Sequence, residues 1–290
     1  MAIATVVKTI GASGVFSTVQ LWEDGAPTNL VTAERSAAGT FAVAAFQQGE
    51  ALSFVGSGAT GKFLDTDSTA PGNGTYVTYG ITAGNPTLND VVTGGTSGAT
   101  CILSSSTAID TGIIWEGQCQ NQEFVVAGTV VSIAGSTTST TAYKHLTTVA
   151  GASFRDHADV LTNPLRYNAA VGAALNCTTA AGTCVSLVEN NNRISKLQIK
   201  ASGLLGRALT ISGSAAFVYQ CIIEGGVISA LTSNTTVLFS SAGTVRNCVI
   251  IQRGGTADHI IATQTQSPFL YNCTIVAPIG LADQPESIFS

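Results

Sequence analysis

The segment VRNCVIIQRGG, residues 245–255, decides the fold because the C-terminal half of the chain repeats it. Its two near-copies are VYQCIIEGGV at 218–227 and LYNCTIVAPIG at 270–280. Alignment on Cys221, Cys248 and Cys273 gives two steps of nearly equal length. A repeat of about 25 residues indicates a stacked architecture, in which each repeat buries its apolar face against its neighbours.

The same repeat extends one step further upstream, where RISKLQIKASG (193–203) carries Leu197 in place of the cysteine. Short segments rich in Val, Ile and Thr alternate there with Gly, Ser and Asn, without a helical period. Asn-Gly and Asp-Gly hairpin dipeptides are nearly absent from this half. We therefore expect residues 109–290 to form a right-handed parallel β-helix with two or three strands per coil.

The composition limits the classes of protein to which the chain can belong. Charged residues make up 10% of its 290 residues, and the net charge is −5, without a visible basic face. We therefore expect an all-β protein with no nucleic-acid partner, since phosphate binding needs clustered Lys and Arg. No run of 18 apolar residues is present, and the first residues lack the features of a signal peptide, so we expect no membrane association.

The seven cysteines are irregularly spaced and form no Cys-x-x-Cys motif, so we expect no metal site and no cofactor. The repeated cysteines Cys221, Cys248 and Cys273 should fill the core of adjacent coils as small apolar side chains. Cys177 and Cys184 are the best pair if any disulfide forms.

An amide precedes each repeated cysteine, at Gln220, Asn247 and Asn272. Amides at matching positions of stacked strands can form hydrogen-bonded ladders. We expect these three side chains to stabilise the stack in this way.

An amphipathic stretch from Ser17 to about Gly25 predicts a short helix with Ser17 as its N-cap. Such a helix could cover the unpaired strand edge at the end of the stack. Trp22 and Trp115 could stack on sugar rings, but we expect both to fill the core, since buried tryptophan is strongly stabilising.

A different pattern separates the N-terminal residues 1–35 from the repeats. GEALSFVGSGATGKFL and NDVVTGGTSGATCIL share an SGAT core, at 57–60 and again at 97–100, with Glu50 and Asp90 at matching places. Two copies of strand, Gly-rich turn and strand predict a small antiparallel β module at 36–108, inserted into the β-helix. We therefore divide the chain into residues 1–35, 36–108 and 109–290.

Four phenylalanines of this module allow two interpretations. Phe41, Phe46, Phe54 and Phe63 could form an exposed surface for a capsid or tail protein. We expect them instead to form the module's own core, because a module of this size needs most of its apolar side chains inside.

Three segments together resemble the pectate-lyase-like β-helix proteins of tailed bacteriophages and prophages. They are TIGASGVFSTVQLWEDGAPTNLVTAE (9–34), IIWEGQCQNQEF (113–124) and YKHLTTVAGASFRDHADVLTNPLRYN (143–168), followed by the cysteine-marked repeats. The GGTSGAT segment is similar to small β modules of phage structural proteins. The resemblance implies a right-handed parallel β-helix in a virion component, and it carries over no catalytic residue.

The sequence offers little chemistry for catalysis. Glycoside hydrolysis needs two facing carboxylates, whereas Glu224 and Asp258, the acids inside clear repeats, fall at different phases. His145 and His259 are isolated in the sequence. We therefore expect no catalytic residue and no enzyme.

The most enzyme-like cluster is SFRDHAD, with Arg155, Asp156, His157 and Asp159. A histidine beside an aspartate could transfer protons. No nucleophile motif accompanies it, so we expect a polar loop in which Arg155 pairs with an acid and His157 bonds backbone carbonyls.

These observations favour a non-enzymatic phage structural protein, first a head decoration or cement protein on the capsid exterior. The alternatives are a tail fibre or tailspike adhesin that binds host surface glycan, and a polysaccharide-degrading enzyme. The expected partners are other virion proteins, the major capsid protein or a tail hub, with host glycan added in the fibre alternative. By analogy with phage appendages we expect a homotrimer, made in the host cytoplasm and located on the virion exterior.

Overall fold

The structure of the protein is a computed structural model. The structure describes residues 2–42, 45–66, 76–104, 108–179, 182–203, 206–226, 236–252, 260–263 and 268–276. The chain divides into two compact units: Met1–Val6, Gly25–Trp115 and Gly135–Tyr143 form the first, and Val7–Asp24, Glu116–Ala134 and Lys144–Ser290 form the second.

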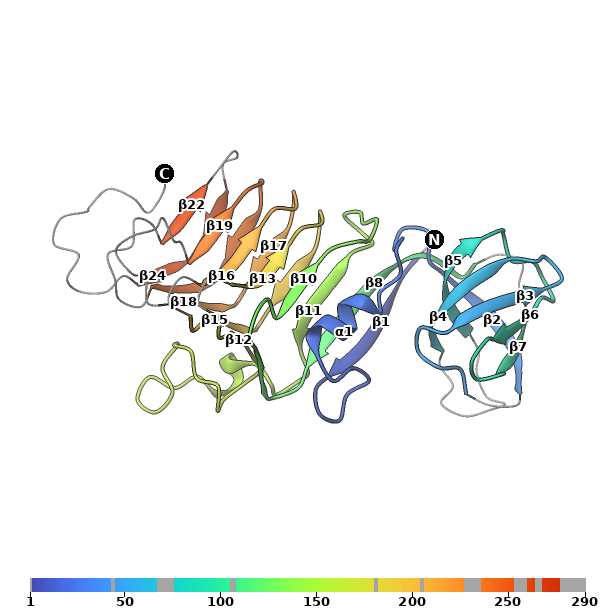
Figure 1. The fold of residues 1–290 in the computed structure, drawn as a ribbon, viewed down its shortest axis with the longest axis horizontal. Helices are drawn as coiled ribbons and strands as arrows, with labels where there is room; N and C mark the ends of the chain where they lie inside the picture. Colours follow the sequence, from blue (N-terminus) through green and yellow to red (C-terminus); the bar gives the residue numbers. More distant parts are fainter. Residues whose placement is uncertain are drawn as a thin grey trace. The chain divides into compact units, whose positions relative to one another are not determined.

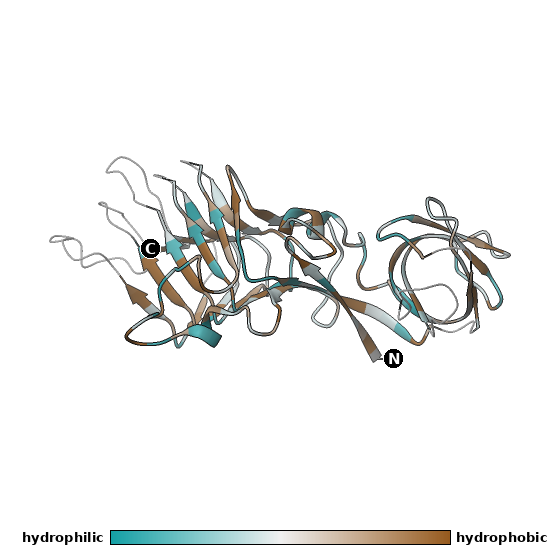
Figure 2. Ribbon diagram, turned by 90° about the horizontal axis from the view of Figure 1, so that it is seen from below, coloured by the Kyte–Doolittle hydropathy of each residue, from teal (hydrophilic) through white to brown (hydrophobic). Residues whose placement is uncertain are grey.

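Six antiparallel strands close into a barrel in the first unit, and Figure 2 shows them as a ring. They are β2 (Glu34–Ala42), β3 (Ala51–Val55), β4 (Thr60–Thr66), β5 (Tyr76–Ala83), β6 (Val91–Gly94) and β7 (Thr100–Leu103). The hydrogen-bonded order is β2–β5–β4–β3–β6–β7, and β7 pairs with β2 to complete the ring. The closure removes the free sheet edges of these strands.

The barrel has an aromatic core of its own. Phe41, Phe54 and Phe63 are buried, and the partly buried Phe46 packs against them. The rings of Phe46 and Phe63 stack with centroids 5.1 Å apart, and Phe54 meets Tyr79 edge to face at 4.9 Å. The prediction that the four phenylalanines form the core of this module is confirmed.

The two SGAT turns of the barrel are held by the two acids of the duplicated pattern, each by the acid of the other copy. Glu50 accepts hydrogen bonds from the backbone N–H groups of Thr96 and Ser97 and from the Ser97 hydroxyl, at 3.0, 2.9 and 2.7 Å. Asp90 accepts from the N–H and hydroxyl of Ser57, at 2.8 and 2.6 Å. Strands β3 and β6 pair antiparallel, which brings each acid to the opposite turn. We call these contacts the acid clamps.

The acid clamps also set the protonation of both carboxylates. Burial alone would raise the pKa of Glu50 and Asp90, because the charged form loses its hydration. The hydrogen bonds from the opposite turn and from nearby backbone outweigh burial, so both pKa values lie below their ordinary range. Both groups are therefore charged near neutral pH.

Replacement of Asp90 by Asn should lower the free energy of unfolding by about 2 kcal/mol, because an amide N–H₂ would face donors that now meet a carboxylate. Denaturant unfolding of the full chain measures this change. Ser57→Ala is the graded control, since it removes one hydroxyl and leaves the backbone contact, and it should cost less. An Asp90→Asn protein as stable as the wild type would contradict the clamp.

Parallel strands form three sheets of the second unit (Figure 1). The first contains β11 (Lys144–Thr148), β14 (Arg193–Ser195), β17 (Phe217–Tyr219), β20 (Thr244–Arg246), β23 (Phe269–Tyr271) and the part of β8 (Asp110–Cys119) that follows Trp115. The second contains β10 (Val131–Ile133), β13 (Thr183–Leu187), β16 (Arg207–Ile211), β19 (Val237–Phe239) and β22 (Ile261–Thr263). The third contains β9 (Glu123–Val126), β12 (Ala174–Cys177), β15 (Gln198–Ala201), β18 (Ile222–Gly225), β21 (Val249–Gln252) and β24 (Thr274–Val276). Strand β1 (Ala2–Ile10) pairs with β8.

The strand registers follow the repeat found in the sequence. Gln198 pairs with Ile222, Ile222 with Val249, and Val249 with Thr274, so the preceding Leu197 and cysteines are equivalent. Cys221 and Cys248 are buried and Cys273 is half-buried, as expected for a row that points into the core. All seven cysteines are free, Cys177 and Cys184 included.

The amides before the cysteines have a different role from the one expected. Gln220, Asn247 and Asn272 have φ of 58°, 51° and 49°, and Lys196 at the equivalent place has 62°. This is the left-handed region, which Asn tolerates better than most residues. The repeated amide therefore marks a backbone corner between two strands, and the expected side-chain ladder is not among the hydrogen bonds of the described residues.

The expected fold class, a right-handed parallel β-helix with a small inserted antiparallel domain, is wrong. The chain is all-β, but it combines a closed antiparallel six-strand barrel with parallel sheets. The repeat in the sequence specifies only how equivalent strands pair from one repeat to the next. It carries no information on the closure of β2 on β7, which joins the first and last strands of the barrel.

The predicted N-terminal helix is present as α1 (Val19–Asp24), with the Thr18 hydroxyl, rather than Ser17, accepting from the N–H of Leu21. Two of its side chains bind the edge strand β10 and the residue after it. Gln20 accepts from the N–H of Ser132 at 3.1 Å, and Glu23 accepts from the N–H of Ala134 at 3.0 Å. The helix thus accepts hydrogen bonds from backbone N–H groups at the edge of this sheet, which have no neighbouring strand to bind.

A buried ion cluster fixes this helix. The Lys144 ammonium lies 2.6 Å from Glu23 and 3.2 Å from Glu189, and it donates to the carbonyl of Ala134 at 2.7 Å. Asn192 donates to Glu189 and accepts from the backbone of Lys144. A buried charge needs such complete pairing, so this cluster is structural.

The corner positions allow a test of the backbone argument, because the Asn247 side chain is exposed. Asn247→Ala should lower the free energy of unfolding by about 1 kcal/mol, since a β-carbon is disfavoured at positive φ. Asn247→Gly is the matched control and should be nearly neutral. Equal losses in both variants, measured by denaturant unfolding, would instead indicate a role for the amide side chain.

Candidate functional site

The outer face of the first parallel sheet gathers the side chains with functional potential. Leu146, Ile194 and Val218 are fully buried on the inner face of β11, β14 and β17. Because successive residues of a strand point to opposite faces, their neighbours point outward. These outward residues, with those of β8, β20 and β23, form the candidate site.

His145 lies at the centre of a polar cluster on β8, β11, β14 and β17. Its Nδ1 is 3.0 Å from Glu116 Oε2, and its Nε2 is 3.0 Å from Ser195 Oγ. Ser195 also donates to the Thr147 hydroxyl at 2.8 Å, and the Tyr219 hydroxyl is 3.3 Å from Nε2. The expectation that His145 is isolated is wrong, because the parallel pairing brings together residues that are far apart in the sequence.

This cluster has the residue types of a Glu–His–Ser triad but not the access that a nucleophile needs. Ser195 is only 1% exposed, and its hydroxyl is 3.0 Å from His145 Nε2, which the Tyr219 hydroxyl also approaches. A catalytic serine must reach a substrate carbonyl next to an oxyanion-binding group. We therefore interpret the cluster as a rigid polar support for the neighbouring surface.

The same contacts keep Glu116 charged. The hydrogen bond from His145 is the largest cause that lowers the pKa of Glu116, and a bond from Gln118 at 2.6 Å adds to it. Burial acts in the opposite direction but is outweighed. The carboxylate therefore orients the imidazole at neutral pH.

A row of aromatic rings and one guanidinium continues from this cluster. We name it the aromatic–arginine strip, and it consists of Phe217, Tyr219, Arg246, Phe269 and Tyr271. Tyr219 pairs in register with Arg246, and Arg246 with Tyr271, so the three side chains follow one another at the strand spacing of about 4.8 Å.

The side chains of the strip are arranged by contacts among themselves. The Arg246 guanidinium lies over the ring of Phe217 at 4.7 Å and over that of Tyr219 at 5.6 Å. The rings of Phe269 and Tyr271 are nearly parallel, at 3°, with centroids 6.3 Å apart. Tyr219 also stacks on His145, with ring centres 6.2 Å apart.

Much of this surface is open to solvent. Phe269 is 52% and Tyr271 54% exposed, and Arg246 is exposed as well. Single exposed apolar residues need no explanation, but a continuous row of aromatics beside a cation is a surface suited to binding. The sequence alone did not reveal the strip, because its members belong to successive repeats and become neighbours only through the strand pairing.

The predicted polar loop SFRDHAD (153–159) begins a longer segment, residues 153–168, that packs on the third sheet. It begins with the 3₁₀ helix η1 (Phe154–His157), and Phe154 and Tyr167 pack with Ile222 in a small core. His157 donates to the carbonyl of Gly151 at 2.9 Å, as expected. Arg155 makes no ion pair within the described part of the chain, so the expected partner acid is not found.

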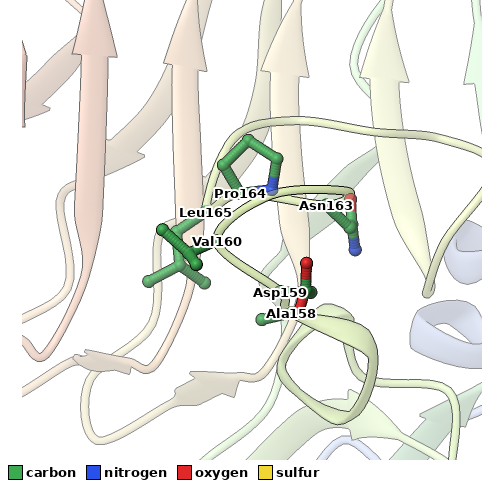
Figure 3. A pocket seen from close by; sticks show the side chains of 6 residues that line it. All are labelled: Ala158, Asp159, Val160, Asn163, Pro164 and Leu165. Carbon is green, nitrogen blue, oxygen red and sulfur yellow. The ribbon is translucent and has the colours of Figure 1, made fainter.

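The tip of this loop encloses a shallow pocket (Figure 3). The lining residues are Ala158, Asp159, Val160, Asn163, Pro164 and Leu165. Asp159 already accepts from the N–H groups of Leu161 and Thr162 and from the Thr162 hydroxyl. These bonds lower the pKa of Asp159 and leave no acid–base partner, so the pocket offers no catalytic group.

Other residues considered from the sequence take structural places. Trp22 and Trp115 are fully buried, as expected, and neither is a sugar platform. Glu224 is buried, and its Oε1 lies 3.5 Å from the Nζ atom of Lys200. Asp258, His259 and the residues after 276, which would close the last repeat, lie outside the described residues.

Over the described residues, no group of His, Cys, Asp and Glu is arranged to hold a metal ion. In the same part of the chain no helix has the length and apolar character to cross a membrane. Comparison with protein-family models, with curated proteins and with solved structures found no match to this chain. The resemblance to phage β-helix proteins therefore stays a prediction.

Replacement of Glu116 by Gln should lower the free energy of unfolding at pH 7 by about 1 kcal/mol, because the hydrogen-bonded charge is lost. The folded-state pKa of Glu116 is lowered, so its contribution is present above the unfolded value of about 4.3 and disappears as the pH falls through the folded value. The two stability curves should thus converge below about pH 4. Asp156→Asn, at an exposed carboxylate of η1, is the control and should change little, whereas a constant offset of the Glu116→Gln curve down to pH 2 would contradict the account.

Proposed function

We propose that this chain is a non-enzymatic structural protein of a tailed-bacteriophage virion, and that it binds a glycan of the host surface along the aromatic–arginine strip. The observation that carries the proposal is the in-register row of the half-buried Tyr219 and the exposed Arg246 and Tyr271, flanked by Phe217 and Phe269. It favours the adhesin alternative over the head decoration protein that the sequence first suggested.

The geometry of the strip suits an extended sugar polymer. Sugar rings have apolar faces that pack on flat aromatic side chains, and their hydroxyl groups accept hydrogen bonds from a guanidinium. The strip spans β17, β20 and β23, a length of about 10 Å at the usual strand spacing. A linear glycan can therefore lie across several strands and contact several rings at once.

Two observations support a binding role without catalysis. The outward positions from β11 to β23 contain no carboxylate, and Glu116 on β8 is engaged by His145, whereas glycoside hydrolysis needs two facing carboxylates. The serine beside His145 is buried, which argues against acyl transfer. The rigid His145 cluster instead holds Tyr219 in place.

The virion part of the proposal rests on the sequence resemblance. The exterior location, the contact with a capsid or tail protein and the homotrimer are predictions of the same origin. Immunogold labelling of purified phage particles with an antibody against this chain distinguishes the head from the tail.

Removal of aromatic rings from the strip should weaken glycan binding. Tyr271→Ala and Phe269→Ala should each reduce the affinity by about fivefold, from roughly 1 kcal/mol per stacked ring, and the double variant should lose more. The measurement is bio-layer interferometry of the full chain against immobilised bacterial surface polysaccharides, neutral and acidic. Leu161→Ala is the matched control, because Leu161 is 88% exposed on the loop outside the strip.

The outcomes separate binding from assembly. Weaker binding in the strip variants, with an unchanged control and unchanged sedimentation, supports the proposal. Failure of the wild-type chain to bind any polymer of the panel would overturn it. A change in the oligomeric state of the strip variants would show that the strip contacts another copy of the chain, and would equally overturn it.

A further inference from the structure

We infer that the glycan recognised by the strip is acidic, with carboxylate groups that meet Arg246. This inference rests on the proposed glycan binding and deepens it by naming the chemical class of the ligand. Three observations lead to it: the charge of the outer face, the exposed position of Arg246 beside aromatic rings and the distance of the nearest carboxylate on that face.

The charge of the face differs from that of the chain. The sequence has 17 acidic and 12 basic residues, yet the outward positions from β11 to β23 contain two arginines, one histidine and no carboxylate. These positions are His145, Thr147, Arg193, Ser195, Phe217, Tyr219, Thr244, Arg246, Phe269 and Tyr271. Lys196, exposed at the corner after β14, offsets the charge of Glu116. An acidic polymer would thus approach a locally positive surface.

Arg246 has the geometry of a carboxylate receptor. Its guanidinium carbon lies 4.7 Å from the ring centre of Phe217 and 5.6 Å from that of Tyr219, and the residue is exposed. No carboxylate among the described residues forms an ion pair with it. A guanidinium held beside aromatic rings can form two parallel hydrogen bonds to a carboxylate and loses less conformational freedom on binding than a free side chain.

The carboxylate of this face does not neutralise the strip. Glu116 is on β8, four strands from β20, a separation of about 19 Å at the usual strand spacing. This exceeds the Debye length of about 8 Å at physiological ionic strength. Glu116 is also engaged by His145 and Gln118.

Matched polymers test the inference directly. Polygalacturonate, alginate and polysialic acid are each compared with their carboxyl-reduced neutral forms, in binding to the full chain by bio-layer interferometry. The wild type should prefer the acidic form of at least one polymer by about tenfold, and Arg246→Gln should remove that preference, since hydrogen bonds to charged groups are worth about 1.5–3 kcal/mol. Arg246→Lys should restore part of it, because it keeps the charge but not the paired donors.

The control variant is Arg155→Gln, which removes an exposed arginine of η1 outside the strip and should leave the preference unchanged. Binding that is equal for acidic and reduced polymers, or a preference that survives Arg246→Gln, would overturn the inference while the proposed glycan binding stands. Absence of binding to every acidic and every neutral polymer would overturn both. Equal losses in Arg155→Gln and Arg246→Gln would show attraction by net charge alone and would also contradict the inference.

Discussion

The in-register parallel pairing of equivalent strands is the constraint on which the second unit depends. Ile194 pairs with Val218, and Val218 with Val245, so that these fully buried side chains form one continuous apolar row. The same register lines up the outward residues. It places Tyr219, Arg246 and Tyr271 in one row, so the surface proposed to bind glycan follows directly from the pairing that builds the fold.

The chain uses its few charges in two distinct ways. Several carboxylates are committed to structure: Glu50 and Asp90 hold the barrel turns, and Glu23 and Glu189 neutralise the buried Lys144. Such buried groups are stabilising only when their hydrogen bonds are complete. Arg246 differs, because aromatic rings position it without an acid partner among the described residues. An exposed charge positioned by aromatic rings is the arrangement expected of a binding group.

Local patterns in the sequence predicted what depends on local chemistry. The cysteine repeat gave the correct strand register, the amphipathic stretch before Gly25 gave the helix, and the duplicated SGAT segments gave two related hairpins. The recurrence of Asn was also a true signal, but positive φ explains it better than a side-chain ladder. The burial of both tryptophans followed from their size and scarcity.

The remaining features depend on pairings between distant segments. Closure of the barrel joins β2 to β7, and nothing near either strand specifies that partner. The His145 cluster joins Glu116 to Ser195 across β11, although residues 149–192, which include β12 and β13, separate β11 from β14 in the sequence. The strand register decides which side chains of successive repeats are neighbours. This register depends on the length of each connecting segment, which varies from one repeat to the next. The candidate site could therefore not be predicted from the sequence without the strand register of the parallel sheet.

The most direct test of glycan binding by the strip is hydroxyl-radical footprinting of the full chain, with and without the polysaccharide that it binds most tightly. Aromatic side chains react readily with hydroxyl radicals, so their protection reports which rings the polymer covers. The account predicts protection of Tyr219, Phe269 and Tyr271, with unchanged reactivity of Leu161 on the loop outside the strip. Unchanged reactivity of the three rings, with protection elsewhere on the chain, would contradict it.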